Sequence, residues 1–373
     1  MNIGFDAKRV FQNRSGLGNY SRSTLRLLAR FYAENNYYLF SGKPDKKIFL
    51  PSENQFIVEP EKGFSSLFPD YWRSWALYHQ AGNLNLDIFH GLSNELPLSI
   101  KKTRTKSVVT IHDLIFLRFP EYYSSVDRQI YSLKFKYACR VADKVIAISL
   151  ATKEDIIHFL GTDPQKIEVV YQSCDPIFRK PVSAEMKSAV KKKYNLPDQY
   201  ILFLGTIEKR KNALSLIKAF LNENIDFPLV IAGKPTAYIS EINDFLKGNP
   251  AGNRIIFRHN IETSDLPSLY QSSMVFAYPS VFEGFGIPIL EALNSGVPVL
   301  TSTGSCFSET GGDAAMYSDP YNTEQIGSAL SKLLNSNDLR QSMIKKGFNH
   351  SRQFDEDKVA ANLMKLYSDL VIK

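Results

Sequence analysis

The stretch that decides the fold follows a predicted strand and reads Pro279-Ser-Val-Phe-Glu283-Gly-Phe-Gly286-Ile-Pro288-Ile-Leu-Glu291-Ala-Leu-Asn-Ser-Gly296. Apolar residues predict a buried strand before it, over Val275–Tyr278, and another after it, over Val297–Thr301. A glycine-flanked loop leads from the first strand into a helix that has Pro288 in its first turn and stops at Gly296. Strand, loop, helix and strand in this order form the repeating unit of a parallel α/β sheet.

Short apolar strands alternate with amphipathic helices along the whole 373-residue chain. They fall into two series of six, which predicts two doubly wound domains of similar size. Gln172 to Gln199, with three prolines and a Lys-rich helix, is the predicted connection. The other expected strands are Asn2–Phe5, Tyr37–Phe40, Ile88–His90, Ser107–Ile111, Lys144–Ile148, Ile167–Tyr171, Tyr200–Leu204, Pro228–Ala232, Ile255–Phe257 and Ala315–Tyr317.

The composition is that of a globular protein, with 44% hydrophobic and 22% charged residues. Three widely separated cysteines, with no Cys-x-x-Cys pair, exclude a disulfide scaffold and a structural zinc site. The first residues hold no apolar signal-peptide core, and no run of about 18 apolar residues occurs. The sequence therefore predicts a cytoplasmic protein, either free or lying against a membrane without crossing it.

The net charge of +7 suits anionic partners, whether phosphates, nucleic acid or anionic lipid. Basic clusters at Lys101–Lys106 and Lys187–Lys193 lack the interleaved aromatic residues on which bases stack, so nucleic acid is the least favoured of the three. Trp72, Trp75 and Tyr78 recur at helical spacing, which favours a place in the core over membrane contact.

Ligands of open α/β sheets bind beyond the carboxyl ends of the strands, so the residues that follow strands are the site candidates. Glu283 and Glu291 follow Tyr278, and two such carboxylates can act as acid and base or accept hydrogen bonds from sugar or ribose hydroxyls. His112 directly follows a buried strand, which favours a functional over a structural role. For His90, at another strand end, contact with a substrate and a structural role are equally supported.

Two loops suit an anion. Gly16 and Gly18 stand where the first loop enters a helix, and glycines there allow close approach of a backbone to an anion, although a tight turn alone would also explain them. Lys209, Arg210 and Lys211 precede a helix N-terminus, where positive charge is unfavourable. They require a counter-anion such as phosphate, unless the loop is simply solvated.

Taken in order, these motifs resemble those of the retaining glycosyltransferases of family 4, and the resemblance covers nearly the whole chain. It rests on Gly16-Leu-Gly-Asn-Tyr-Ser, Thr110-Ile-His-Asp113, Ala142-Asp-Lys-Val-Ile-Ala-Ile-Ser149, Gly205-Thr-Ile-Glu-Lys-Arg-Lys-Asn212, Asp265-Leu-Pro-Ser-Leu-Tyr270, and Tyr278-Pro-Ser followed by Glu283-Gly-Phe-Gly-Ile-Pro-Ile-Leu-Glu291-Ala.

The resemblance implies the GT-B architecture, two facing Rossmann-like domains with a cleft between them, in which a final helix near Asp355–Ile372 returns to the first domain. The expected domains are residues 1–171 plus 356–373 on the acceptor side and residues 199–355 on the donor side, with residues 172–198 as linker. It also implies transfer of a sugar from a nucleotide diphosphate donor with retention of configuration, for polysaccharide biosynthesis.

The same resemblance implies roles for single residues. Glu291 would bind the ribose hydroxyls, and Glu283 the hydroxyls of the donor sugar. Arg210 and Lys211 would neutralise the departing diphosphate, and His112 would contact the donor sugar at the reacting face.

Backbone groups complete the expected donor site. The amides of Phe285, Gly286 and Ile287 would hold the sugar, while Gly16 and Gly18 would let the first loop close over the diphosphate. No metal and no cofactor are expected, because the cations of the phosphate loop could do the work of a metal.

One departure from the family pattern is Thr206, where many members carry an arginine whose charge Arg210 would replace. The form of this loop looks most like the mannosyltransferase-like branch, which makes GDP-mannose the first donor hypothesis. A UDP-sugar donor, or a non-catalytic nucleotide-sugar-binding protein, is the alternative. The acceptor, a glycan or lipid-linked, would depend on residues 63–66 and 119–127. A dinucleotide oxidoreductase is disfavoured because the third glycine of its fingerprint is missing.

Overall fold

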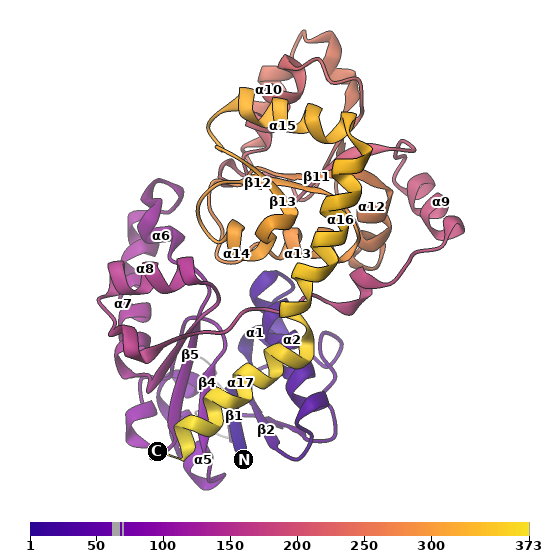
Figure 1. Cartoon of the computed structure of the whole chain (residues 1–373). Helices are drawn as coiled ribbons and strands as arrows, with labels where there is room; N and C mark the ends of the chain where they lie inside the picture. Colours follow the sequence, from indigo (N-terminus) through magenta and orange to yellow (C-terminus); the bar gives the residue numbers. More distant parts are fainter. Residues whose placement is uncertain (62–67, 69–70, 373) are drawn as a thin grey trace. The chain divides into compact units, whose positions relative to one another are not determined.

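The structure, a computed structural model, describes residues 1–61, 68 and 71–372. It contains two compact α/β units, coloured along the chain in Figure 1. Unit 1 comprises residues 1–173 and 354–373, and unit 2 comprises residues 174–353. Each unit is built on one parallel sheet, so the predicted fold class is confirmed.

The sheet of unit 1 has seven parallel strands in the order β3-β2-β1-β4-β5-β6-β7. Six of them were predicted to within two residues at either end. The missed strand is β3, a four-residue edge strand in which Gln55 is buried and donates to the Leu25 carbonyl, while Phe56 is exposed. That arrangement gives no apolar pattern to read. The strands are β1 (Asn2–Asp6), β2 (Asn36–Phe40), β3 (Gln55–Val58), β4 (Ile88–Gly91), β5 (Lys106–Ile111), β6 (Lys144–Ala147) and β7 (Ile167–Val169).

Helices cover both faces of this sheet. One face packs on α1, α2 and α17, and the other on α5, α7 and α8. Figure 1 shows α17, from the end of the chain, beside α2, and Leu363 and Tyr367 lie in the same buried cluster as Leu25 and Leu28. The helices of unit 1 are α1 (Lys8–Gln12), α2 (Gly16–Phe31), α5 (Leu77–Asn83), α6 (Ile115–Arg118), α7 (Ser125–Val141), α8 (Leu150–Leu160) and α17 (Glu356–Val371).

The predicted aromatic core helix is only partly as expected. Trp72 is buried, but Trp75 is about half exposed (49%), and the side chain of Tyr78 lies outside what the structure describes. A π-helix spans Trp72–Ala76. Its wider turn breaks the regular spacing that places every third or fourth residue on one face, so Trp75 turns away from the core. Of the two expected acceptor loops, residues 63–66 also lie outside the described part.

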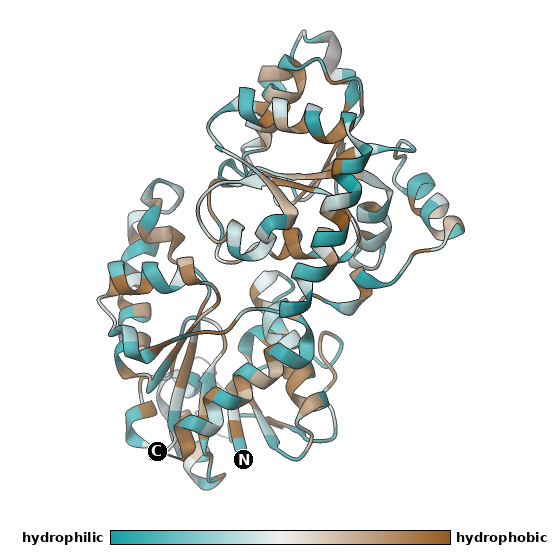
Figure 2. Ribbon diagram, viewed as in Figure 1, coloured by the Kyte–Doolittle hydropathy of each residue, from teal (hydrophilic) through white to brown (hydrophobic). Residues whose placement is uncertain are grey.

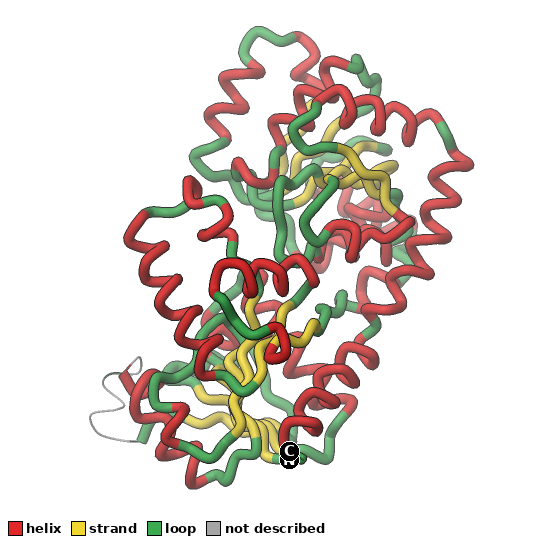
Figure 3. The backbone as a smooth tube through the Cα atoms, turned by 60° about the vertical axis from the view of Figure 1, so that its left-hand side comes forward, coloured by secondary structure: helices red, strands yellow, loops and turns green. Residues whose placement is uncertain are grey.

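Unit 2 has a six-stranded parallel sheet in the order β10-β9-β8-β11-β12-β13. All six strands were predicted. Figure 3 shows them as a layer between helices, and in Figure 2 this layer is largely apolar. They are β8 (Tyr200–Leu204), β9 (Leu229–Ala232), β10 (Ile255–Arg258), β11 (Ser273–Tyr278), β12 (Val299–Ser302) and β13 (Ala315–Ser318). The helices are α9 (Ala184–Lys193), α10 (Ala213–Asn222), α11 (Ile239–Leu246), α12 (Leu266–Ser272), α13 (Ile287–Asn294), α14 (Phe307–Gly311), α15 (Thr323–Asn335) and α16 (Asn337–Ser351).

Most of the stretch expected to be a linker is part of unit 2. Residues from 174 onward belong to it, because Val190 of α9 is buried and the Tyr194 hydroxyl donates to the Asp265 carboxylate at 2.8 Å. In both sheets the strand order reverses once, between β1 and β4 and between β8 and β11. Loops diverge at such a point and leave room for a ligand at the carboxyl ends of the strands.

Candidate active site

The reversal point of unit 2 brings together the two loops singled out in the sequence. Residues 205–212, which we call the basic loop, follow β8, and residues 279–286, which we call the glutamate loop, follow β11. The Val281 amide donates to the Arg210 carbonyl at 2.8 Å, and the Arg210 guanidinium donates to the Phe282 carbonyl at 2.6 Å. These reciprocal bonds fix the basic loop against the glutamate loop.

Glu283 lies at the centre of this arrangement and is buried. Its Oε1 accepts from Lys211 Nζ at 2.6 Å and from the Ser280 and Tyr278 hydroxyls at 2.7 and 3.0 Å. Arg210 pairs with the same oxygen at 2.8 Å. Burial alone would raise the pKa of Glu283, but the charges of Lys211 and Arg210 outweigh it and lower the pKa to about 2.

This carboxylate supplies a counter-anion for Arg210 and Lys211 from within the protein. The basic loop forms a short 3-10 helix, Lys209–Lys211, after which Asn212 adopts a left-handed conformation (φ 61°) and α10 begins. The Asn212 side chain holds this turn by donating to the Pro279 and Pro320 carbonyls. The cations are therefore fixed in place, which is what stabilising charge on a reacting group requires.

Gly286 ends the glutamate loop with φ 90°, a conformation that favours glycine, and α13 begins at Ile287 with Pro288 in its first turn, as predicted. The Phe285 carbonyl accepts from the Thr310 hydroxyl. The first amides of a helix point out of its N-terminus and attract negative charge or oxygen acceptors. The roles expected for the amides of Phe285, Gly286 and Ile287 stay predictions.

Glu291, in the same helix, has the opposite electrostatic environment. Its side chain is partly buried, and its Oε2 accepts from the Tyr270 hydroxyl at 2.8 Å. Burial raises the pKa of Glu291 to about 7, and the hydrogen bond from Tyr270 opposes that rise only in part. Near neutral pH, Glu283 is thus an anion held by two cations, while Glu291 is poised between its neutral and ionised forms.

In unit 1, His112 is buried just beyond the end of β5. Its backbone amide donates to Asn94 Oδ1 at 2.8 Å, and its Nε2 lies 2.9 Å from the Leu92 carbonyl. A carbonyl only accepts, so Nε2 carries the proton and Nδ1 keeps a lone pair. Burial lowers the pKa of His112 to about 4, so the ring is neutral at pH 7.

Behind His112 lies a buried chain of hydrogen bonds. The Tyr20 ring packs edge-on against the His112 ring, with the two ring centroids 4.6 Å apart. The Tyr20 hydroxyl lies 3.1 Å from the Thr110 hydroxyl. The Thr110 hydroxyl lies 2.8 Å from His90 Nε2, and His90 Nδ1 lies 2.6 Å from the Tyr367 hydroxyl in α17. Because His90 is fully buried in this chain, the structure supports its structural role.

The two glycines at the start of α2 differ in what they require. A Cβ on Gly18 would lie 2.0 Å from the Asn13 carbonyl oxygen, so a side chain cannot fit there. A Cβ on Gly16 would meet nothing within 4 Å. Tight packing thus explains Gly18 by itself, and closure of this loop over a diphosphate stays a prediction.

The family can now be assigned. Residues 14–177 match the sequence family described as Glycosyltransferase Family 4, and residues 186–350 match Glycosyl transferases group 1. The chain belongs to the family 4 glycosyltransferases. This glycosyltransferase is 28% identical over 288 residues to O-antigen chain mannosyltransferase B of Escherichia coli, covering 75% of this chain and 74% of that protein.

Solved structures place the glycosyltransferase in the GT-B fold. Sucrose-phosphate synthase from Thermosynechococcus elongatus has a TM-score of 0.80 at 19% identity and covers 99% of both chains. Anabaena Alr3699/HepE in complex with UDP and glucose has a TM-score of 0.75 at 18% identity, also over 99% of both chains.

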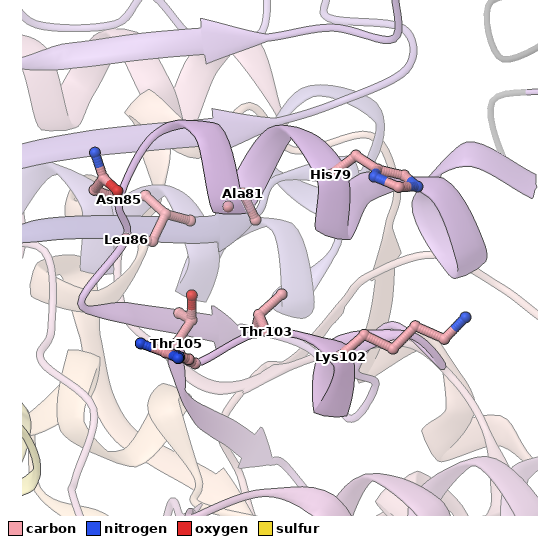
Figure 4. A pocket seen from close by; sticks show the side chains of 9 residues that line it. His79, Ala81, Asn85, Leu86, Lys102, Thr103 and Thr105 are labelled. Atoms are coloured by element: carbon pink, nitrogen blue, oxygen red, sulfur yellow. The ribbon is translucent and has the colours of Figure 1, made fainter.

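Unit 1 of the glycosyltransferase also contains a cavity of about 500 Å³, which Figure 4 shows. It lies beside the segments that lead into β4 and β5, whereas His112 follows the opposite end of β5. Its lining is formed by His79, Ala81, Gly82, Asn85, Leu86, Lys102, Thr103, Arg104 and Thr105.

Among the residues that the structure describes, no group of three or more His, Cys, Asp or Glu side chains is placed to hold a metal ion. No helix in residues 1–61, 68 and 71–372 combines the length and the apolarity needed to cross a bilayer.

Proposed function

We propose that this glycosyltransferase is a retaining, metal-independent hexosyltransferase that moves mannose from GDP-mannose to a glycan or lipid-linked acceptor in the cytoplasm, without a cofactor. The observation that carries the proposal is the meeting of Lys211 and Arg210 on one oxygen of Glu283 at the strand-order reversal of unit 2. Likeness to an O-antigen chain mannosyltransferase supports mannose as the transferred sugar.

In the proposed reaction, the bond from the anomeric carbon to the diphosphate oxygen breaks, and the acceptor oxygen bonds to that carbon on the same face. The acceptor proton passes to the departing phosphate. Lys211 and Arg210 stabilise the charge that develops on this phosphate, which requires them to be shared between it and Glu283. Glu283 then accepts hydrogen bonds from the sugar hydroxyls, and Glu291 from the ribose.

The nucleotide is the first point to test. In a thermal-shift series at equal concentrations, GDP should raise the melting temperature more than UDP, ADP or dTDP, because a ligand stabilises in proportion to the logarithm of its concentration over its dissociation constant. The alternative is a UDP-sugar donor, supported by the fold likeness to Alr3699/HepE in complex with UDP and glucose. A larger shift with UDP would replace the donor and leave the reaction class standing.

A second alternative, binding without catalysis, is tested by incubating the purified protein with GDP-mannose. Release of GDP, with or without an acceptor, supports an enzyme. Binding without any release would contradict one.

Transfer is expected to survive excess EDTA. Lys211 and Arg210 are fixed near the proposed diphosphate site and can neutralise it as a divalent cation would. The measurement is the initial rate with EDTA, compared with the rates after adding Mg²⁺ or Mn²⁺. Loss of transfer that Mn²⁺ restores would contradict the proposal.

His112→Ala is expected to lower the rate of transfer about 100-fold or more while the protein stays folded. The neutral ring presents the Nδ1 lone pair, which can orient a substrate hydroxyl. The control is the melting temperature of the variant. If activity falls only in proportion to the unfolded fraction, His112 is structural.

A further inference from the structure

Helix α7 carries apolar side chains on two opposite faces. One face packs into unit 1 through Phe135, Ala138 and Cys139, which are buried. Val126, Ile130 and Leu133 are 63%, 45% and 72% exposed. At about 100° per residue, these three positions lie within roughly 60° of one another and opposite Phe135. The helix therefore presents a second apolar row to solvent.

Single exposed apolar residues are ordinary, but a row along one helix face is not. A helix that is apolar on opposite sides is normally covered on both. The row on α7 is therefore a candidate binding surface.

Neighbouring segments extend this row. The Tyr137 hydroxyl of α7 donates to the Leu98 carbonyl at 2.7 Å, and the Leu98 side chain is 43% exposed. The Leu98 amide in turn donates to the Ser74 carbonyl at 2.9 Å, beside the half-exposed Trp75. We call Val126, Ile130, Leu133, Leu98 and Trp75 the apolar band.

Positive charge flanks the band. Lys134, Lys136 and Arg140 of α7 are exposed, and Lys134 also contacts Glu95 at 3.1 Å. Exposed Lys101 follows soon after Leu98 in the chain. The Lys166 ammonium donates to the Arg140 carbonyl at the end of α7. Burial and the nearby charge of Lys101 lower the pKa of Lys166, so Lys101 lies close to this end of the helix. The basic region thus continues from α7 to residues 101–104.

We propose that the apolar band and its basic flank dock unit 1 on the surface of an anionic lipid bilayer. Apolar side chains on one helix face enter the boundary between headgroups and acyl chains, while long basic side chains beside them reach the lipid phosphates. Charge selects the bilayer over a neutral apolar partner, because basic segments are attracted to anionic lipid. The helix lies in the plane of the interface and does not cross it.

The direction of α7 adds a consequence that rests on the proposed function. The helix leads from the carboxyl end of β5 to the start of β6, so Val126 lies near the sheet edge that His112 occupies. Docking through α7 therefore brings that edge to the membrane, where a lipid-linked acceptor would be found.

The test uses the full chain and vesicles of phosphatidylcholine with or without phosphatidylglycerol. Sedimentation should show at least about tenfold tighter binding to the anionic vesicles, weakened by salt. The double variant Ile130→Glu with Leu133→Glu should lose about tenfold of that affinity. The matched control is Leu50→Glu, at an equally exposed leucine of unit 1 outside the band (77%), which should bind as the wild type does.

Fluorescence gives a second readout, since the chain has two tryptophans and Trp72 is buried. Anionic vesicles should shift the emission of Trp75 to shorter wavelength, and Trp75→Phe should remove the shift. Equal vesicle binding by wild type and double variant would overturn the proposal, as would a concentration-dependent dimer that the double variant abolishes. Failure of the proposed function would appear instead as no release of GDP from GDP-mannose, with vesicle binding unchanged.

Discussion

Replacing Lys211 by alanine is expected to reduce the rate of sugar transfer by about 100-fold to 1,000-fold, the usual effect of removing one fixed group that stabilises developing charge. Lys211 Nζ lies 2.6 Å from Glu283 Oε1 and 2.5 Å from the Tyr278 hydroxyl, so its place is set by two partners. The variant leaves Arg210 as the remaining cation on Glu283, and the pKa of Glu283 should rise. The measurement is the initial rate at saturating donor.

The matched control is Lys209→Ala, which removes an exposed lysine from the same loop. It should change the rate by less than about threefold, as is usual for a surface charge. Equal losses in the two variants would show that the net charge of the loop matters and the position of Lys211 does not.

The second large effect concerns Glu291. Glu291→Gln is expected to weaken nucleotide binding by about 1.5–3 kcal/mol, or about 10-fold to 150-fold in dissociation constant, because the variant replaces a charged acceptor with a neutral amide, in which one of the two acceptor oxygens becomes a donor group. Wild-type affinity should rise between about pH 6 and pH 8, as the carboxyl ionises through its pKa of about 7. The variant should lack this rise. Titration calorimetry with GDP at several pH values makes the measurement.

The same pKa has an opposite effect on the stability of the free protein. An acid whose pKa is higher in the folded state keeps its proton there while the unfolded chain releases it. The free energy of unfolding of the protein should therefore fall as pH rises from about 4.5 to about 7, and Glu291 contributes on the order of 3 kcal/mol to this fall. Denaturant unfolding should show that this fall is smaller in Glu291→Gln. Identical pH dependence in both proteins would contradict the assignment.

Much of the fold could be predicted because parallel strands buried on both faces read as unbroken apolar runs. Strand β3 could not, since its one buried residue is the polar Gln55, which donates to the Leu25 carbonyl in another element. The exposure of Trp75 was missed for a similar reason, because a π-helix shifts the spacing that the sequence suggested.

The candidate site was predictable at the level of which residues follow which strands. Its electrostatics were not. Glu283 and Glu291 lie eight positions apart in one motif, yet their pKa values move in opposite directions. The charges of Lys211 and Arg210 outweigh burial at Glu283, whereas burial prevails at Glu291, where no cation among the described residues reaches the carboxyl and the hydrogen bond from Tyr270 offsets the rise only in part. Tyr20, Asn94 and Ser280 were not singled out either, since each acts through a contact made across the fold.

The place of α17 determines when the protein can finish folding during synthesis. Unit 1 holds the first 173 residues, but Tyr367, which closes the hydrogen-bond chain through His90, leaves the ribosome only after the whole of unit 2. Unit 2 is complete in the growing chain before α17 appears, so the domain made first is the one finished last. Until then the side of α2 that packs on Leu363 and Tyr367 faces water. A chain that stops before residue 356 would keep the whole of unit 2 and still leave this apolar surface open to aggregation.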